Sequence, residues 1–62
     1  MKKFIYMFAL GGKVVWSGDT EEVLRSRAEN DVDKAEVEQL IESGEVGSFI
    51  CLETGEMAMR TE

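Results

Sequence analysis

The glycine pair at positions 11 and 12 constrains the fold more than any other feature of the sequence. It separates two runs rich in aromatic and β-favouring residues, KFIYMFAL and KVVWSG. Two glycines between such runs are typical of a two-residue hairpin turn, because glycine readily adopts the positive φ angles that this turn requires. We therefore expect an antiparallel hairpin in which Leu10 opposes Lys13 and Met7 opposes Trp16. Both faces of this hairpin carry large apolar groups, so one face can take helices and the other needs a cover.

The first of these runs follows two lysines, which is the outline of a signal peptide. The apolar part, residues 4–10, is at the short limit for such a peptide, and no A-x-A-like cleavage motif follows it. It is also far shorter than the ~20 residues that a membrane-spanning helix needs. The single cysteine, Cys51, leaves no internal disulfide, which favours a reducing compartment. We interpret the run as a strand and expect a cytoplasmic protein without membrane contact.

Two short helices are predicted after the first hairpin. Asp19 is suited to cap the first helix, because Glu22 follows three residues later at capping-box spacing. Asp33 and Glu36 repeat this spacing at the second helix, which Gly44 is expected to end.

One long helix from Thr20 to Ser43 is the alternative. At about 100° per residue, the apolar residues of its two halves would form stripes that do not line up. A break or sharp bend near residues 30–33 would reconcile the two stripes, and Asn and Asp residues lie at that point.

Residues 47–61 are expected to form a second hairpin with its turn around Thr54 and Gly55, so that Glu53 opposes Glu56. This register predicts an apolar inner face made by Ile50, Leu52, Met57 and Met59. It leaves on the outer face Phe49, Cys51, Ala58 and Arg60. The chain is then one small domain, residues 1–62, with an α+β fold of order ββααββ. We expect a small antiparallel sheet of about four strands with two short helices, or one broken helix, packed on one face.

Residues suited to catalysis or metal binding are scarce. The chain has no histidine, the commonest general base and metal ligand. Cys51 lies within a predicted strand, and no cationic neighbour in sequence would activate its thiol. The acidic stretch that begins at Asp31 lacks the position-5 ligand and the position-6 glycine of an EF-hand loop. We therefore expect a protein that is not an enzyme, with no catalytic residue, no cofactor and no metal site.

Acidic residues are concentrated in the middle of the chain. The formal net charge is −6, and residues 19–45 hold ten acidic residues against three basic ones. This charge disfavours direct binding to nucleic acid or to an anionic membrane. In the first helix Arg25 can compensate its acidic neighbours, whereas Glu38 and Glu42 of the second helix are like charges at i,i+4. The candidate partner-binding residues are Asp31, Asp33, Glu36, Glu38, Glu42 and Glu45.

Two functions follow from these features. The first is a non-enzymatic protein-binding module, a regulator or inhibitor of the type that phages encode, which forms a homodimer through its sheet. Its acidic helical layer would engage a basic protein, for example a nucleic-acid-binding protein whose phosphate ligand the acids imitate. The second is a structural or assembly subunit that packs through the apolar hairpin face, with the acids serving solubility. Tyr6 and Trp16 are the candidate anchors for a dimer or partner contact, or else core residues.

Overall fold

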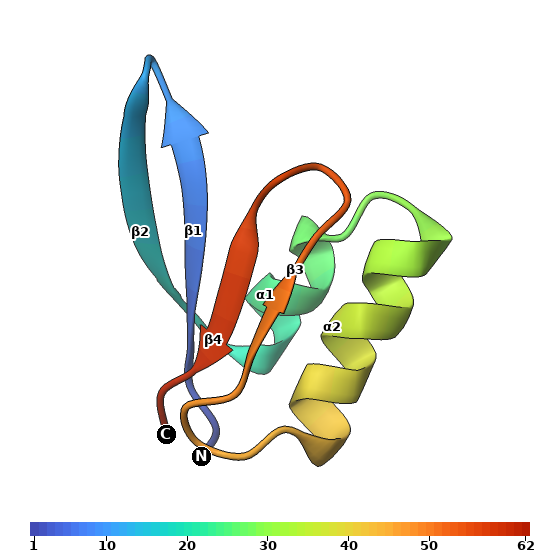
Figure 1. Cartoon of the computed structure of the whole chain (residues 1–62). Helices are drawn as coiled ribbons and strands as arrows, with labels where there is room; N and C mark the ends of the chain where they lie inside the picture. The colour runs from blue at the N-terminus through green and yellow to red at the C-terminus, as the bar shows by residue number, and fades with distance from the viewer.

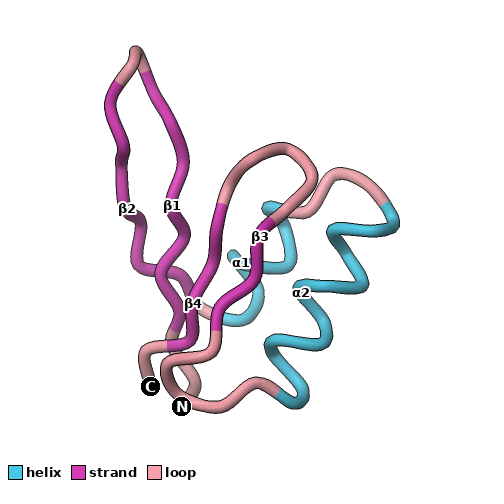
Figure 2. The backbone as a smooth tube through the Cα atoms, viewed as in Figure 1, coloured by secondary structure: helices cyan, strands magenta, loops and turns pink.

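The computed structural model describes residues 1–62 and contains one open sheet and two helices (Figure 1). The elements are β1 (Phe4–Leu10), β2 (Lys13–Asp19), α1 (Glu21–Arg27), α2 (Asp31–Ser43), β3 (Phe49–Cys51) and β4 (Met57–Arg60). The strands are arranged in the order β2-β1-β4-β3, each antiparallel to its neighbour. Both helices lie on the same side of the sheet (Figure 2). The predicted α+β fold of order ββααββ is confirmed.

The hairpin of β1 and β2 has the predicted register, with Leu10 opposite Lys13 and Met7 opposite Trp16. Gly11 and Gly12 form its turn with φ angles of 57° and 77°. Strand β4 pairs only with the first four residues of β1. The far half of the hairpin therefore projects beyond the rest of the sheet, as Figure 1 shows.

Helix α1 begins one residue later than predicted. Its N-cap is Thr20, whose hydroxyl accepts a hydrogen bond from the Val23 amide at 3.3 Å. The prediction that Asp19 caps this helix was wrong. Asp19 is instead the buried last residue of β2, and its carboxylate binds Arg27 at the far end of α1.

Helix α2 is separate from α1, with residues 28–30 between them, so the predicted break is confirmed and the single long helix is excluded. The cap of α2 is Asn30, not Asp33 as predicted: the Asn30 side-chain oxygen accepts the Asp33 amide at 2.8 Å. Gly44 ends the helix as expected. A side chain at position 44 would collide with the Leu40 carbonyl oxygen, so a close backbone approach requires glycine here.

The second hairpin is shifted by one residue from the predicted register. Cys51 lies opposite Met57 and Ile50 lies opposite Ala58. The predicted pairing of Glu53 with Glu56 would have set Cys51 opposite Ala58 and Ile50 opposite Met59. The turn explains the shift. The Leu52 amide donates a hydrogen bond to the Glu56 carbonyl, so the loop contains three residues and not the predicted two. A three-residue loop of this kind needs its last residue in the left-handed region, and Gly55 has a φ of 100°.

A one-residue shift moves every side chain of a strand to the opposite face. Ala58 is therefore buried under the helices, and Arg60 shares its side of the sheet, with the guanidinium donating to the Gly44 carbonyl at the end of α2. Met57 and Met59 lie on the outer side instead, where Ala58 and Arg60 were expected.

The hydrophobic core lies between the sheet and the helices. Its members are Phe4, Tyr6, Leu24, Ala28, Val37, Leu40, Ile41, Leu52 and Ala58. The sheet contributes alternate residues to this core, as expected when one face is covered. The other face of the sheet has no second layer over it (Figure 2).

Candidate functional site

The uncovered face of the sheet, here called the outer face, is the most distinctive surface of the molecule. Strand pairing places two rows of side chains across it. The first row is Trp16, Met7, Met57 and Cys51. The second row is Gly18, Ile5, Met59 and Phe49. Neither row contains a charged residue, so this face differs in character from the rest of a chain in which 32% of the residues are charged.

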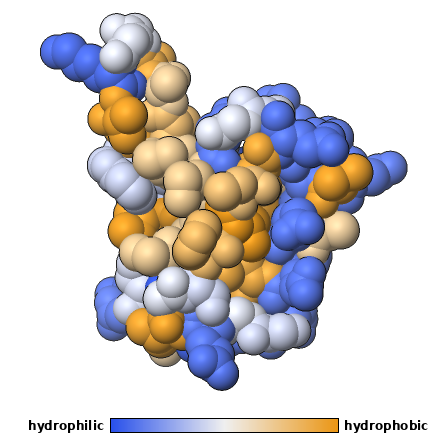
Figure 3. Space-filling model, in the orientation of Figure 1, coloured by the Kyte–Doolittle hydropathy of each residue, from blue (hydrophilic) through white to orange (hydrophobic).

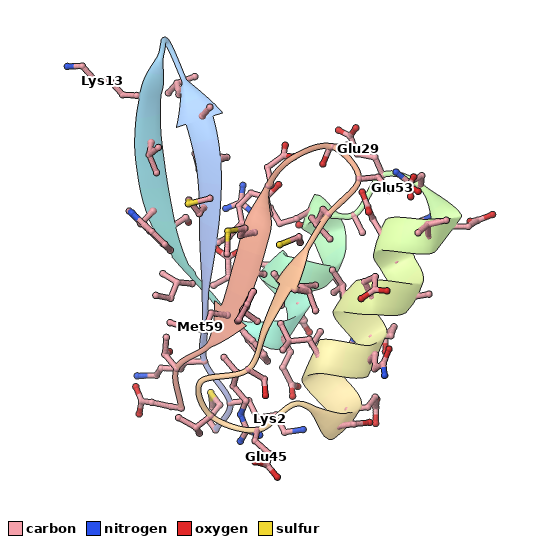
Figure 4. All side chains as sticks on the ribbon, in the orientation of Figure 1. Lys2, Lys13, Glu29, Glu45, Glu53 and Met59 are labelled. Atoms are coloured by element: carbon pink, nitrogen blue, oxygen red, sulfur yellow. The ribbon has the colours of Figure 1, made fainter.

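The two largest side chains of these rows are well exposed. Trp16 retains 56% of its accessible surface and Phe49 retains 60%. Figure 3 shows apolar side chains gathered over the strands, with hydrophilic residues around them and over α2. Figure 4 shows the Met59 side chain on β4 in the same orientation. Continuous apolar surface of this kind is typical of an interaction site, whereas single exposed apolar residues are ordinary.

A hollow of about 430 Å³ lies at one end of the outer face. Gly18 and Ile5, which pair directly across β2 and β1, form part of its wall. Lys3 and Thr61 contribute from the ends of the chain. A Cβ atom at Gly18 would meet no atom within 4 Å, so the missing side chain of this glycine contributes to the open space.

The structure separates the two predicted aromatic anchors. Trp16 lies on the outer face, where a partner can reach it. Tyr6 is buried on the helix side, with only 6% of its surface exposed, and the Arg27 guanidinium lies over its ring at 4.7 Å from the centroid. Tyr6 is therefore part of the core, and Trp16 alone remains as a candidate anchor.

The predicted acidic residues do not form one continuous surface. Asp33 is 1% exposed, and its carboxylate accepts hydrogen bonds from the Asn30 side-chain amide and from the Glu53 backbone amide. It stabilises the start of α2 and the β3–β4 turn, and it is not available to a partner.

Glu38 and Glu42 are not the unpaired like charges that the sequence suggested. Arg25 of α1 forms ion pairs with both, with the Glu42 carboxylate at 3.8 Å. The hydrogen bond to Glu38 is the main reason that the pKa of Arg25 is raised. This interhelical contact reduces the negative field of α2.

Besides the buried Asp33, three of the predicted acids have no cationic partner: Asp31, Glu36 and Glu45. Asp31 and Glu45 are exposed near opposite ends of α2, and Glu36 is half-buried beside a groove between α2 and β3. Figure 4 shows Glu45 far from Glu29 and Glu53, at the other end of the molecule. The acids are thus distributed around the helical side and are not focused on one point.

A buried polar cluster joins β2 to α1. The Asp19 carboxylate, whose side chain is fully buried, accepts hydrogen bonds from the Arg27 guanidinium at 3.1 and 3.2 Å and from the Ser17 hydroxyl at 3.0 Å. The hydrogen bond to Asp19 raises the pKa of Arg27. Every member of this cluster is satisfied, so it holds the helix against the hairpin and leaves no group free for chemistry.

The neighbouring Tyr6 hydroxyl is perturbed by its surroundings. Burial raises the pKa of Tyr6, and the nearby Glu56 carboxylate raises it further, because both disfavour the phenolate. One Glu56 oxygen is itself buried without a hydrogen-bond partner. A neutral phenol is thus the stable form of Tyr6, which fits its place in the core.

No group of three or more potential metal-ligating side chains occurs in the structure. None of the helices has the length and apolar character that crossing a membrane requires. A scan against protein-family models and searches of curated proteins and of solved structures found no match to this chain. The geometry of the outer face is therefore the main basis for a functional proposal.

Sequence reasoning identified Trp16 and placed Phe49 and Cys51 on the outer face, but it missed Met57 and Met59. Met57 and Met59 were assigned to the inner face because the turn was taken to have two residues. The signal that would have placed them correctly is Gly55, since glycine in the last position of a three-residue loop fixes the other register. The sequence does not indicate that Gly18 borders a hollow, because the hollow depends on the residues that lie next to Gly18 in the folded sheet.

Proposed function

We propose that this protein is a non-enzymatic assembly module that forms a homodimer by packing its outer face against that of a second copy. The observation that carries the proposal is the outer face itself: a sheet face of eight uncharged residues that no helix covers. Burial of apolar surface contributes about 25 cal/mol per Å², so covering this face stabilises a chain whose own core is thin.

Charge does not oppose a second copy as the occupant. Two chains that each carry a net charge of −6 repel one another unless their acids are kept apart. In a face-to-face dimer the sheets lie about 10 Å apart and the two acidic helical layers lie on opposite outsides, about 30 Å from each other. This distance exceeds the ~10 Å Debye length at 0.1 M salt, so the repulsion is largely screened.

The composition of the face also suits a dimer. Its two largest side chains, Trp16 and Phe49, each retain more than half of their accessible surface, which a second copy would cover. The interface would be rich in Met and Trp, which are enriched in the buried parts of interfaces.

The second candidate function is capture of a basic protein by the acidic helical layer. The observation that favours it is the absence of cationic partners at Asp31 and Glu45. Neutralising both in Asp31→Asn/Glu45→Gln leaves the Arg25 ion pairs in place. Weaker and less salt-sensitive binding of a basic protein by this variant would support the candidate, and unchanged binding would remove it.

Sedimentation equilibrium tests the dimer proposal with a matched pair of variants. Met57→Glu places a carboxylate in the middle of the outer face, and Gln39→Glu adds the same charge on the exposed surface of α2. The wild-type chain and Gln39→Glu are expected to have the mass of a dimer at about 100 μM, and Met57→Glu that of a monomer. Circular dichroism verifies that all three are folded. A monomeric wild type, or a dimeric Met57→Glu, would refute the proposal.

A further inference from the structure

The two rows of the outer face differ in where they carry large and small side chains. The first row has its largest residue, Trp16, on β2 and a small one, Cys51, on β3. The second row has no side chain on β2, at Gly18, and a large one, Phe49, on β3. Methionine and isoleucine residues fill the middle of both rows. Side-chain size therefore falls from β2 to β3 along the first row and rises from β2 to β3 along the second.

The geometry points to a specific, self-complementary dimer in which the first row of each copy packs on the second row of the other. This inference rests on the proposed function and specifies its interface. The two-fold axis would run across the strands between the rows, about 3.4 Å from Trp16 and from Gly18 measured along β2. Such an axis keeps each strand over its own counterpart, and its two-fold symmetry makes the interface isologous.

This arrangement pairs large side chains with small ones at both edges of the sheet. Trp16 of one copy lies over Gly18 of the other, and Cys51 lies over Phe49 of the other. In the middle, Met7 lies over Ile5 and Met57 lies over Met59 of the other copy. Alternation of large and small residues across facing positions is what lets two layers interdigitate without voids.

The hollow beside Gly18 supplies the space for Trp16 of the second copy. Its volume of about 430 Å³ accepts an indole ring, and Gly18 brings no side chain into it. Trp16 is otherwise a half-exposed aromatic residue whose burial would remove on the order of 100 Å² from water. Two such contacts, related by the two-fold axis, would anchor the interface at its β2 edge.

The other two-fold arrangement of the same faces is less favourable. Its axis runs along the strands, so each row packs on itself with β2 over β3 of the other copy. Trp16 would then lie over Cys51, where no hollow receives the indole. The hollow beside Gly18 would receive the smaller ring of Phe49 and would keep unfilled volume. Unfilled volume at an interface loses contact energy in the same way as a cavity in a core.

A rescue experiment tests this row pairing. Gly18→Leu fills the hollow, and the chain should tolerate it, because Gly18 has no positive φ and a Cβ there meets no atom within 4 Å. Trp16→Ala removes the side chain that enters the hollow. Each single variant should weaken the dimer at least about tenfold, by a clash or by a void. In the double variant Trp16→Ala/Gly18→Leu, the new leucine of one copy lies over the new alanine of the other. This variant should bind about tenfold more tightly than Gly18→Leu alone.

Dissociation constants from sedimentation equilibrium distinguish the outcomes. Rescue in the double variant supports the row pairing. A double variant that binds no more tightly than Gly18→Leu, together with a monomeric Met57→Glu, would overturn the row pairing and leave the outer face as the interface. Single variants that bind like the wild type would overturn the row pairing as well. A Met57→Glu chain that still forms dimers, or a monomeric wild type, would overturn this inference together with the proposed function.

Discussion

Arg27, the last residue of α1, forms an ion pair with Asp19 at the end of β2, and its Nε lies 3.1 Å from the Asp19 Oδ2 atom. The Asp19 side chain is fully buried. The same guanidinium lies over the ring of Tyr6. One side chain thus ties the first helix to both strands of the hairpin. The helix has only seven residues, which is too short to be stable alone, so this contact and the burial of Leu24 stabilise it.

Removing the Arg27 guanidinium is expected to destabilise the fold. Arg27→Met keeps the apolar stem but leaves the Asp19 carboxylate buried without its cation, which costs about 2–4 kcal/mol of unfolding free energy. Urea denaturation followed by circular dichroism measures this loss. Arg25→Met is the matched control on the same helix, because Arg25 forms only exposed ion pairs. Equal losses from the two variants would contradict the role assigned to the Asp19 cluster.

Asp33 is expected to matter for stability and Asp31 is not, although both lie in the first turn of α2. Asp33→Ala leaves the Glu53 amide and the Asn30 side chain without their acceptor, which costs about 1–3 kcal/mol. Asp31→Ala loses only a favourable charge at the helix N-terminus, worth about 0.3–1 kcal/mol. Urea denaturation of both variants provides the comparison. A larger loss for Asp31→Ala would show that Asp33 does not hold the β3–β4 turn.

The ionisation of Tyr6 should occur at higher pH in the folded chain than in the unfolded one. Its folded-state pKa is raised above 10.0, first by burial and then by Glu56. The native state therefore holds this proton more tightly, so the contribution of Tyr6 to stability is complete below about pH 10 and is lost as the pH rises through the folded-state pKa.

The chain has a single tyrosine, so the ultraviolet absorbance of tyrosinate reports on Tyr6 alone. Its titration midpoint should lie above about 10 in the native protein and near 10 in urea. Circular dichroism at each pH verifies that the chain is still folded. A native midpoint at or below the urea value would contradict the buried position of Tyr6.

The fold was predictable where neighbouring residues determine it. Gly11 and Gly12 define the first turn and hence the whole register of β1 and β2. The break between the helices followed from apolar stripes that do not line up. The caps were misassigned to Asp19 and Asp33, because both carboxylates bind groups that are distant in sequence, which local spacing does not reveal.

The candidate site was only partly predictable for the same physical reason. The Trp16 prediction depended on the first hairpin, whose register is local. The side of the sheet that the helices cover is a tertiary property, so Tyr6 could not be distinguished from Trp16 by sequence. The ion pairs from Arg25 to Glu38 and Glu42 depend on how α1 packs on α2. These ion pairs join α1 to α2 and offset the repulsion between Glu38 and Glu42 that the sequence suggested.

The central claim, that a second copy covers the outer face, is tested most directly by the alkylation rate of Cys51. This residue is the only cysteine, and it is exposed on β3 in the single chain. Its rate should fall about tenfold or more as the protein concentration rises through the dimer dissociation constant, because labelling would then require the open monomer. The Met57→Glu variant should react at one rate at all concentrations. An equally fast reaction of the wild-type thiol at low and high concentration would contradict the claim, even if the chain forms a dimer by another surface.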